Sequence, residues 1–194
     1  MRKLSMLATV STLVLAGGLA WGQKTRLNPR RPSPVVSFDN SDASVNPLAT
    51  TLSGMSATPA TIQFTANNPG SAVAGNSSAT VSWKISGGAS GKTWTLSVYA
   101  NSATFSGCST VPASSVGVSC TSASVTGTGA TASCQAGGPF TLPTTAPGQQ
   151  VASGNEGNSS SHTFTVVLNY QITDSWEYIA NTCPLTITYT VNAP

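Results

Sequence analysis

Two segments near the C-terminal end of the chain alternate between apolar and polar side chains. In Ser161–Ile172 the apolar side chains fall on every second residue, and in Cys183–Val191 leucine, isoleucine, tyrosine and valine alternate with threonine. A period of two residues is typical of a β-strand with one buried face. We expect the two segments to form neighbouring antiparallel strands.

The same alternation occurs earlier in the chain. It predicts further strands over Thr61–Ala66, Ala79–Ser86 and Lys92–Ala100. Trp83 and Trp94 share their parity with aliphatic residues, so we expect both indoles in the core. No helical periodicity of useful length follows the first 22 residues. The pattern therefore predicts an all-β fold, and we expect an immunoglobulin-like antiparallel β-sandwich over residues 58–194.

The pattern weakens between residues 102 and 157, which are rich in glycine, serine, threonine and proline. Val116, Val118 and Cys120 alternate, and so do Phe140 and Leu142, which predicts short strands joined by long loops. Gly148–Ser161 contains almost no apolar residue apart from a valine. We expect this segment to be a mobile, exposed connection.

The N-terminal part of the chain lacks strand periodicity. A basic end precedes an apolar run over Met6–Ala20, which is too short to span a membrane, so we interpret residues 1–22 as a secretory signal peptide. Residues 23–57 contain four prolines among serine, asparagine and aspartate, and we interpret them as an extended linker. Their basic cluster, Lys24–Arg31, suits contact with an anionic cell envelope, with a solvated tail as the simpler alternative.

Charge is scarce in this chain. Without the predicted signal peptide, six basic side chains face five acidic ones, and only Lys84 and Lys92 of the basic ones lie in the predicted domain. Nucleic-acid binding needs a basic stripe, which these two lysines do not supply. We therefore expect no nucleic-acid partner, and no membrane span after removal of the signal.

The chain has four cysteines, Cys108, Cys120, Cys134 and Cys183. An even number in an exported domain favours two disulfides over free thiols. Of the three connectivities we favour Cys108 with Cys120, because they are close in sequence, and Cys134 with Cys183. No Cys-x-x-Cys spacing is present and the single histidine is remote from the cysteines, so we expect no zinc and no cofactor.

Side chains for catalysis are few. His162 is the only histidine, and no Gly-x-Ser-x-Gly motif accompanies it, so a serine hydrolase lacks support. A glycosidase needs two facing carboxylates, and the predicted domain offers only Glu156, Asp174 and Glu177. We expect no catalytic residues and interpret the protein as a non-enzyme.

One short stretch could bind a ligand. Asp174, Trp176, Glu177 and Tyr178 place two aromatic rings and two carboxylates in the connection between the last two predicted strands. An aromatic face can stack on a sugar ring while carboxylates accept hydrogen bonds from its hydroxyls. The alternative is that Trp176 or Tyr178 folds back to cover the end of the core, and this is the more common behaviour of loop aromatics.

Two strands carry a resemblance to a known family. Trp94-Thr95-Leu96 and the terminal Leu185–Pro194 resemble the signature strands of bacterial WxL cell-surface domains, although Tyr189 stands where that family has tryptophan. The resemblance implies non-covalent attachment to a cell wall. More broadly, the chain resembles the exported immunoglobulin-like sandwiches of bacterial surfaces.

These observations lead to one expected function and two alternatives. We expect a non-enzymatic secreted or cell-surface module with a structural or adhesive role, whose partner is a cell-envelope polysaccharide or a surface protein. The alternatives are a carbohydrate-binding module that uses its loop aromatics, and a pilus-like subunit that exchanges a strand with its neighbour. The expected location is extracellular or on the cell surface, with the periplasm as an alternative.

Overall fold

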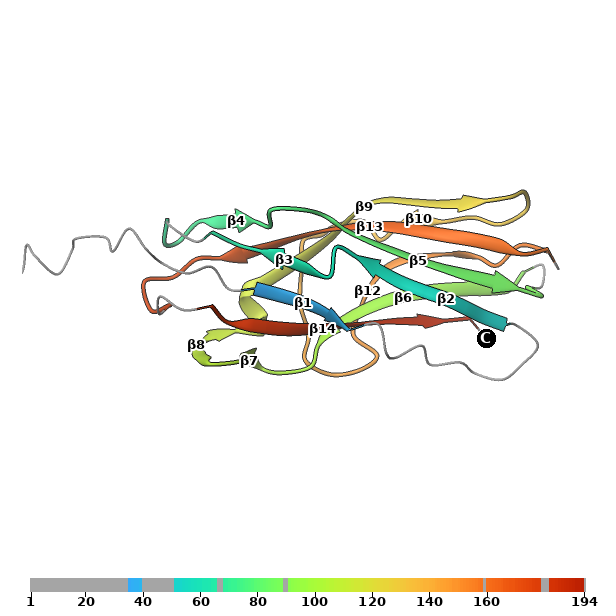
Figure 1. Ribbon diagram of the computed structural model, residues 1–194. Coiled ribbons are helices and arrows are strands. Elements are labelled where there is room, and N and C mark those ends of the chain that lie inside the picture. Colours follow the sequence, from blue (N-terminus) through green and yellow to red (C-terminus); the bar gives the residue numbers. More distant parts are fainter. Residues whose placement is uncertain are drawn as a thin grey trace, which may run out of the picture. The chain divides into compact units, whose positions relative to one another are not determined.

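The computed structural model describes residues 35–39, 51–65, 68–88, 91–158, 160–178 and 182–193, with the backbone alone for residues 35–39 and Thr51. The described residues form an all-β fold in which two sheets face each other across an apolar core (Figure 1). The predicted signal peptide, residues 1–22, lies outside the described residues. No helix within the described ranges has the length and apolarity to cross a membrane.

The first sheet has its longest strand in the interior. Its order is β11 (Phe140–Thr141), β9 (Val116–Thr126), β13 (His162–Thr173), β5 (Ala79–Ser86) and β2 (Thr51–Thr58), and β4 (Ala72–Ala74) pairs with the end of β13. Every pairing in this sheet is antiparallel.

The second sheet contains the C-terminal strand. Its order is β10 (Ser133–Cys134), β12 (Gln149–Asn155), β6 (Thr93–Ala100), β14 (Pro184–Asn192), β1 (Val35–Asp39) and β3 (Thr61–Gln63). The pairing of β1 with β14 is parallel, whereas the other pairings of this sheet are antiparallel. A hairpin of β7 (Thr104–Phe105) and β8 (Cys108–Pro112) and the short 3-10 helix η1 (Ala113–Ser115) complete the elements of the described residues.

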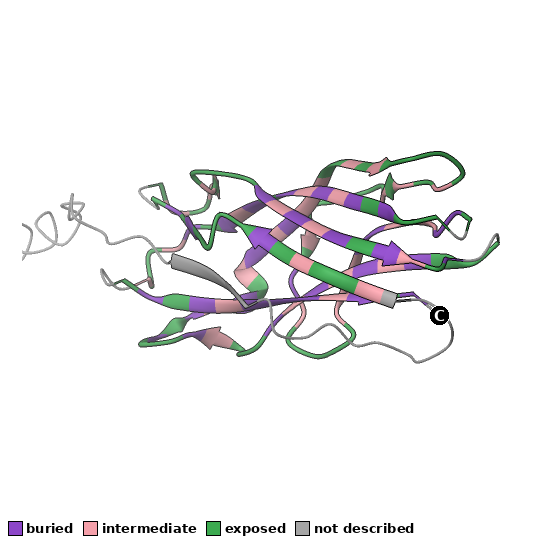
Figure 2. Ribbon diagram, turned by 45° about the vertical axis from the view of Figure 1, so that its right-hand side comes forward, coloured by how far each residue is buried: buried purple, intermediate pink, exposed green. Residues whose placement is uncertain are grey.

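The core follows the alternation read from the sequence. Buried and less buried residues alternate along β5, β6 and β13 (Figure 2). Trp83 and Trp94 are both buried, as predicted, and their rings meet edge to face at 5.0 Å between centroids. Phe164 stacks on Trp83 at 5.6 Å, and the Trp94 Nε1 donates a hydrogen bond to the carbonyl oxygen of Thr131 at 3.2 Å. These aromatic contacts tie β5 and β13 of one sheet to β6 of the other.

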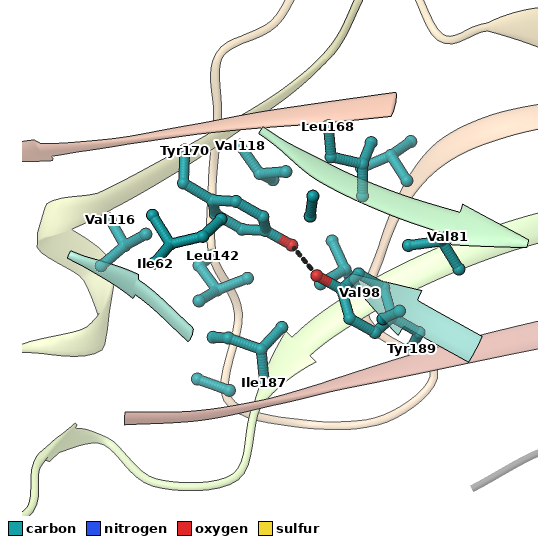
Figure 3. Packing of buried hydrophobic residues seen from close by; sticks show 14 of the residues in the cluster. Ile62, Val81, Val98, Val116, Val118, Leu142, Leu168, Tyr170, Ile187 and Tyr189 are labelled. Atoms are coloured by element: carbon teal, nitrogen blue, oxygen red, sulfur yellow. Dashed lines mark hydrogen bonds between the residues drawn. The ribbon is translucent and has the colours of Figure 1, made fainter. Parts of the chain in front are cut away.

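The last two strands form as predicted, but they are not neighbours. β13 lies between β9 and β5, and β14 lies in the opposite sheet between β6 and β1. They meet only across the core, where the hydroxyls of Tyr170 and Tyr189 are hydrogen-bonded at 2.9 Å (Figure 3). Alternation specifies which face of a strand is buried and leaves the partner strand open. Because ten residues separate the two strands, the chain can cross to the other sheet instead of closing a tight hairpin.

The linker interpretation of residues 23–57 is wrong at two places. Val35–Asp39 forms β1, and Thr51–Thr58 forms β2, which pairs antiparallel with β5. The pairing of β2 shifts register between Ser53 and Ser56, around Gly54, so a simple period of two is interrupted. β1 is only five residues long, too short for its alternation to stand out. The strands of the domain therefore begin before residue 58.

The expected exposed connection over Gly148–Ser161 is also wrong. Half of it is β12 (residues 149–155), which pairs with β6 and β10, and Val151 and Ala152 are buried. A register irregularity between Gln150 and Ala152 places two successive residues in the core, which removes the alternation from the sequence. Gly154 is required here, since a Cβ would lie 1.9 Å from the carbonyl oxygen of Thr131.

The prediction of two disulfides is confirmed, but the favoured pairing is wrong. Cys108 pairs with Cys183 and Cys120 pairs with Cys134, with Cα atoms 5.8 Å and 5.3 Å apart. The β7–β8 hairpin carries Cys108 to the start of β14, where the Ser106 amide donates to the Pro184 carbonyl at 2.8 Å. The second bridge joins β9 of one sheet to β10 of the other. Proximity in sequence was therefore a poor guide to proximity in space, and the two bridges indicate an oxidising environment.

Candidate functional site

The connection that leaves β13 is anchored at its first residue. The Asp174 amide donates to the Ser71 carbonyl at 2.9 Å, and its own carbonyl accepts from the Gly70 amide at 2.9 Å. This pair of hydrogen bonds continues the pairing of β4 with β13 by one residue. Asp174 is buried, so its carboxylate is not presented on the surface.

A tight turn follows and separates the two aromatic rings. The Ser175 carbonyl accepts from the Tyr178 amide at 3.2 Å, and the Ser175 hydroxyl accepts from the Glu177 amide at 3.3 Å. Trp176, at the tip of this turn, is 72% exposed, whereas Tyr178 is half-buried against the core. Glu177 is exposed beside Trp176.

The four residues singled out in the sequence therefore play different parts. Trp176 and Glu177 face solvent together, Tyr178 packs against the core, and Asp174 is buried. The expectation that Trp176 or Tyr178 covers the core is met by Tyr178, whereas Trp176 is exposed. Among the described residues, Trp176 is the one large hydrophobic side chain that is exposed. A large exposed apolar side chain is more informative than a buried one, because the free protein gains nothing from its exposure.

A polar hollow lies along the same end of β13. It has a volume of about 360 Å³ and is lined by the turn before β5, by β9 and by β13, with side chains of Asn76, Ser77, Ser78, Ser119, Asn169 and Gln171. The Ser78 hydroxyl donates to the Asn169 Oδ1 at 2.6 Å, and the Asn76 Oδ1 accepts from the Gln63 amide at 3.0 Å. Amides and hydroxyls without a charged side chain suit a neutral polar ligand such as a sugar.

Sequence reasoning did not find this hollow. Its lining comes from three segments that are far apart in the chain, and each segment alone reads as an ordinary turn or an exposed strand face. Gln171 lines the hollow and lies near the end of β13, and Trp176 follows in the turn after that strand. β4 pairs with residues 171–173, which lead from the residues of β13 that line the hollow to the turn that carries Trp176.

His162 lies at the other end of β13 and has a structural environment. It is buried; its Nδ1 donates to the Thr126 carbonyl at 3.2 Å, and its Nε2 lies 3.2 Å from the Asn158 Oδ1. Gly127 and Gly157 lie directly against the imidazole ring. A Cβ at either position would come within 2.8 Å of a ring nitrogen, so a larger residue does not fit. A general base needs a ring nitrogen that can reach a reacting group, and both nitrogens of His162 already face neighbouring residues.

The described residues contain no group of three or more histidine, cysteine, aspartate or glutamate side chains placed to hold a metal ion. The described residues therefore offer two features for binding: one exposed indole with one exposed carboxylate in the turn after β13, and a neutral polar hollow along residues 169–171 of β13. Comparison with protein-family models and with curated proteins gives no match for this chain.

Proposed function

We propose that this protein is an exported, non-enzymatic module with a structural or adhesive role, built as an immunoglobulin-like sandwich. The strand arrangement supports the immunoglobulin-like assignment: β2, β5, β13 and β9 follow one another in one sheet, and β6 and β14 lie side by side in the other. Successive strands cross between the sheets, as in that architecture. The two disulfides support a location outside the cytoplasm.

Attachment to a cell surface is part of this proposal. The two segments that resemble WxL signature strands are β6 and β14, which are hydrogen-bonded neighbours with Leu96 opposite Val191. Their adjacency supports treating them as one unit. Trp94 and Leu96 are buried, so the surface contact itself has to come from other residues.

The observation that carries the adhesive role is the exposure of Trp176. Interface contacts that dominate binding are enriched in tryptophan, because burying a rigid indole removes a large apolar area from water. Glu177 beside it supplies a charged acceptor at the rim. The turn at Ser175 restrains the backbone that carries both side chains, which reduces the entropy lost on binding.

Trp176→Ala is the direct test. We expect the variant to keep its unfolding midpoint, since an exposed side chain contributes within about 0.5 kcal/mol. Adsorption of the purified protein to isolated cell envelopes should fall at least tenfold, as expected for the loss of a dominant contact worth about 2 kcal/mol. Thr173→Ala, an exposed change at the end of β13, is the matched control. Unchanged adsorption of Trp176→Ala would remove the basis of the proposal.

The polar hollow favours carbohydrate binding as a second candidate function. In that case a neutral glycan lies in the hollow and one sugar ring stacks on Trp176. Titration calorimetry with cell-envelope polysaccharide fragments should then show binding that is weakened both by Asn169→Ala and by Trp176→Ala. If adsorption to envelopes depends on Trp176 while no glycan binds, the partner is a surface protein.

A further inference from the structure

β1 occupies an unusual place in the second sheet. It lies between β14 and β3 (Figure 1), and β3 joins the rest of the sheet only through β1. Residues 35–39 run parallel to residues 184–188 of β14, and residues 35–37 run antiparallel to residues 61–63 of β3. All the other strand pairs of the described residues are antiparallel.

The position that β1 fills borders the core. Val36 is in register with Leu185 on one side and with Ile62 on the other, and Phe38 is in register with Ile187. The side chains of Leu185, Ile62 and Ile187 are buried. Without a strand at this position, β14 and β3 would each present unpaired backbone groups beside an opened apolar core.

No other strand of the described residues can take this position, because each already has its place in the three sheets. The slot beside β14, lined by residues 184–188 and 61–63, therefore requires residues 35–39. β1 is connected to the domain through residues 40–50 alone, a stretch of 11 residues between the end of β1 and the start of β2. The backbone hydrogen bonds of the slot are the same whichever copy of the chain supplies the strand.

We propose that residues 35–39 of one copy fill the slot beside β14 of a second copy, so that chains associate by exchanging β1. Reciprocal exchange gives a closed dimer, and donation from each copy to the next gives a fibre. Strand addition of this kind recognises the slot through main-chain hydrogen bonds and alternating apolar side chains. The exchange goes beyond the adhesive role and does not depend on Trp176.

The balance between self-insertion and exchange is set by concentration. In both states the same strand fills the same slot, so the two states have the same contacts in the slot. The free-energy difference between them is then set by the covalent connection of β1 to its own domain. Because only 11 residues separate the end of β1 from the start of β2, the covalent connection holds β1 at an effective concentration of roughly 1 mM near its own slot. Exchange should therefore become prominent as the protein concentration approaches about 1 mM, and should fall at least tenfold at about 10 µM.

The test uses two full-length variants, Ser37→Cys and Thr186→Cys, which carry distinguishable mass labels. Residues 37 and 186 are opposite each other in the β1–β14 pair, and neighbouring strands lie at a spacing that a disulfide can bridge. Each variant has one added cysteine, so the designed bridge can form only between two chains. The variants are unfolded together at acidic pH, where disulfide exchange is slow, refolded at about 1 mM and then mildly oxidised.

We expect at least tenfold more Ser37–Thr186 heterodimer, counted by intact mass on unreduced protein, than in a matched control. The control pairs Ser37→Cys with Thr190→Cys, which lies on the same strand with similar burial but beyond the register of β1. Adding Phe38→Asp to the donor chain should abolish the excess. Equal yields for the two pairings, or an excess that does not change between about 10 µM and about 1 mM, would overturn the proposal.

Discussion

β13 and β14 have the same kind of sequence and different surroundings. Both alternate, both bury one face, and they contact each other through Tyr170 and Tyr189. β13 is flanked by β9 and β5, two long antiparallel strands. β14 has β6 on one side, and on the other it has five residues that come from near the N-terminal end of the chain.

The difference shows that β13 is held by long neighbours in its own sheet, whereas β14 also depends on a short strand and a disulfide. β13 keeps both of its long neighbours whatever happens before residue 79. β14 relies on β1 at one edge and on the Cys108–Cys183 bridge at its start. Changes aimed at the surroundings of β14 should therefore cost more than matched changes near β13.

Deleting residues 23–56 should have the largest effect. The deletion removes β1 from β14 and β3, and most of β2 from β5. The lost pairing and core cover are comparable to the whole stability of a domain, about 5–15 kcal/mol, so we expect no cooperative thermal transition by circular dichroism. Deleting residues 23–33 instead leaves both strands and should keep the transition. Equal melting of the two forms would show that β14 does not need its second neighbour.

Removing the two disulfides separately compares the two regions directly. Cys108→Ala with Cys183→Ala opens a loop of 75 residues at the start of β14, and should cost about 4.5 kcal/mol. Cys120→Ala with Cys134→Ala opens a loop of 14 residues beside β13, and should cost about 3 kcal/mol. Denaturant unfolding measures both. A larger cost for the second pair would contradict the view that β14 is the strand in need of anchoring.

Truncations along β14 test which of its faces are buried. Ile187→Ala should cost about 2–5 kcal/mol through lost burial and a cavity. The sequence suggests that Thr188 faces solvent, but it is buried and donates a hydrogen bond to the Asn101 Oδ1, so Thr188→Ala should cost about 1 kcal/mol. Thr190→Ala, at a half-buried site, should stay within about 0.5 kcal/mol. Equal unfolding midpoints for the last two variants would mean that the Thr188 hydrogen bond adds nothing.

A further effect concerns the hydrogen bond that joins the two strands. Tyr170→Phe or Tyr189→Phe leaves a buried hydroxyl without this partner and should cost about 1–3 kcal/mol. The double variant should cost less than the sum of the two single variants, because the single hydrogen bond between the two hydroxyls can be lost only once. If the loss of unfolding free energy in the double variant equals the sum of the two single losses, the two hydroxyls are not coupled.

Alkaline pH provides a second measurement on the same pair. Burial raises the pKa of Tyr170 and of Tyr189 well above the ordinary value of 10.0. Unfolded tyrosines lose their protons near that value while the folded ones keep them, so stability is intact below about pH 10 and falls as the pH rises further. The fall should be smaller in the double phenylalanine variant, as measured by unfolding midpoints across this range.

Much of the site at the end of β13 was accessible from the sequence, but its arrangement was not. The aromatic and acidic residues at 174–178 stand out in a chain with few of either. The turn that carries both rings follows Asp174, whose backbone is hydrogen-bonded to residues 70 and 71, about a hundred positions earlier in the chain. The polar hollow could not be predicted, since its lining is assembled only when β4, β9 and β13 come together.

The sequence by itself determined the local choices: all-β structure, the buried parity of β5, β6, β13 and most of β14, and the presence of two disulfides. These follow from period-two alternation and from an even cysteine count, which are properties of neighbouring residues or of composition. Tertiary structure decided which strands are partners, which cysteines pair, that Thr188 is buried, and that residues 35–39 complete a sheet. The two pairings of β1 join residues 24 to 149 positions apart, and a short alternating segment carries no information about which distant edge it will meet.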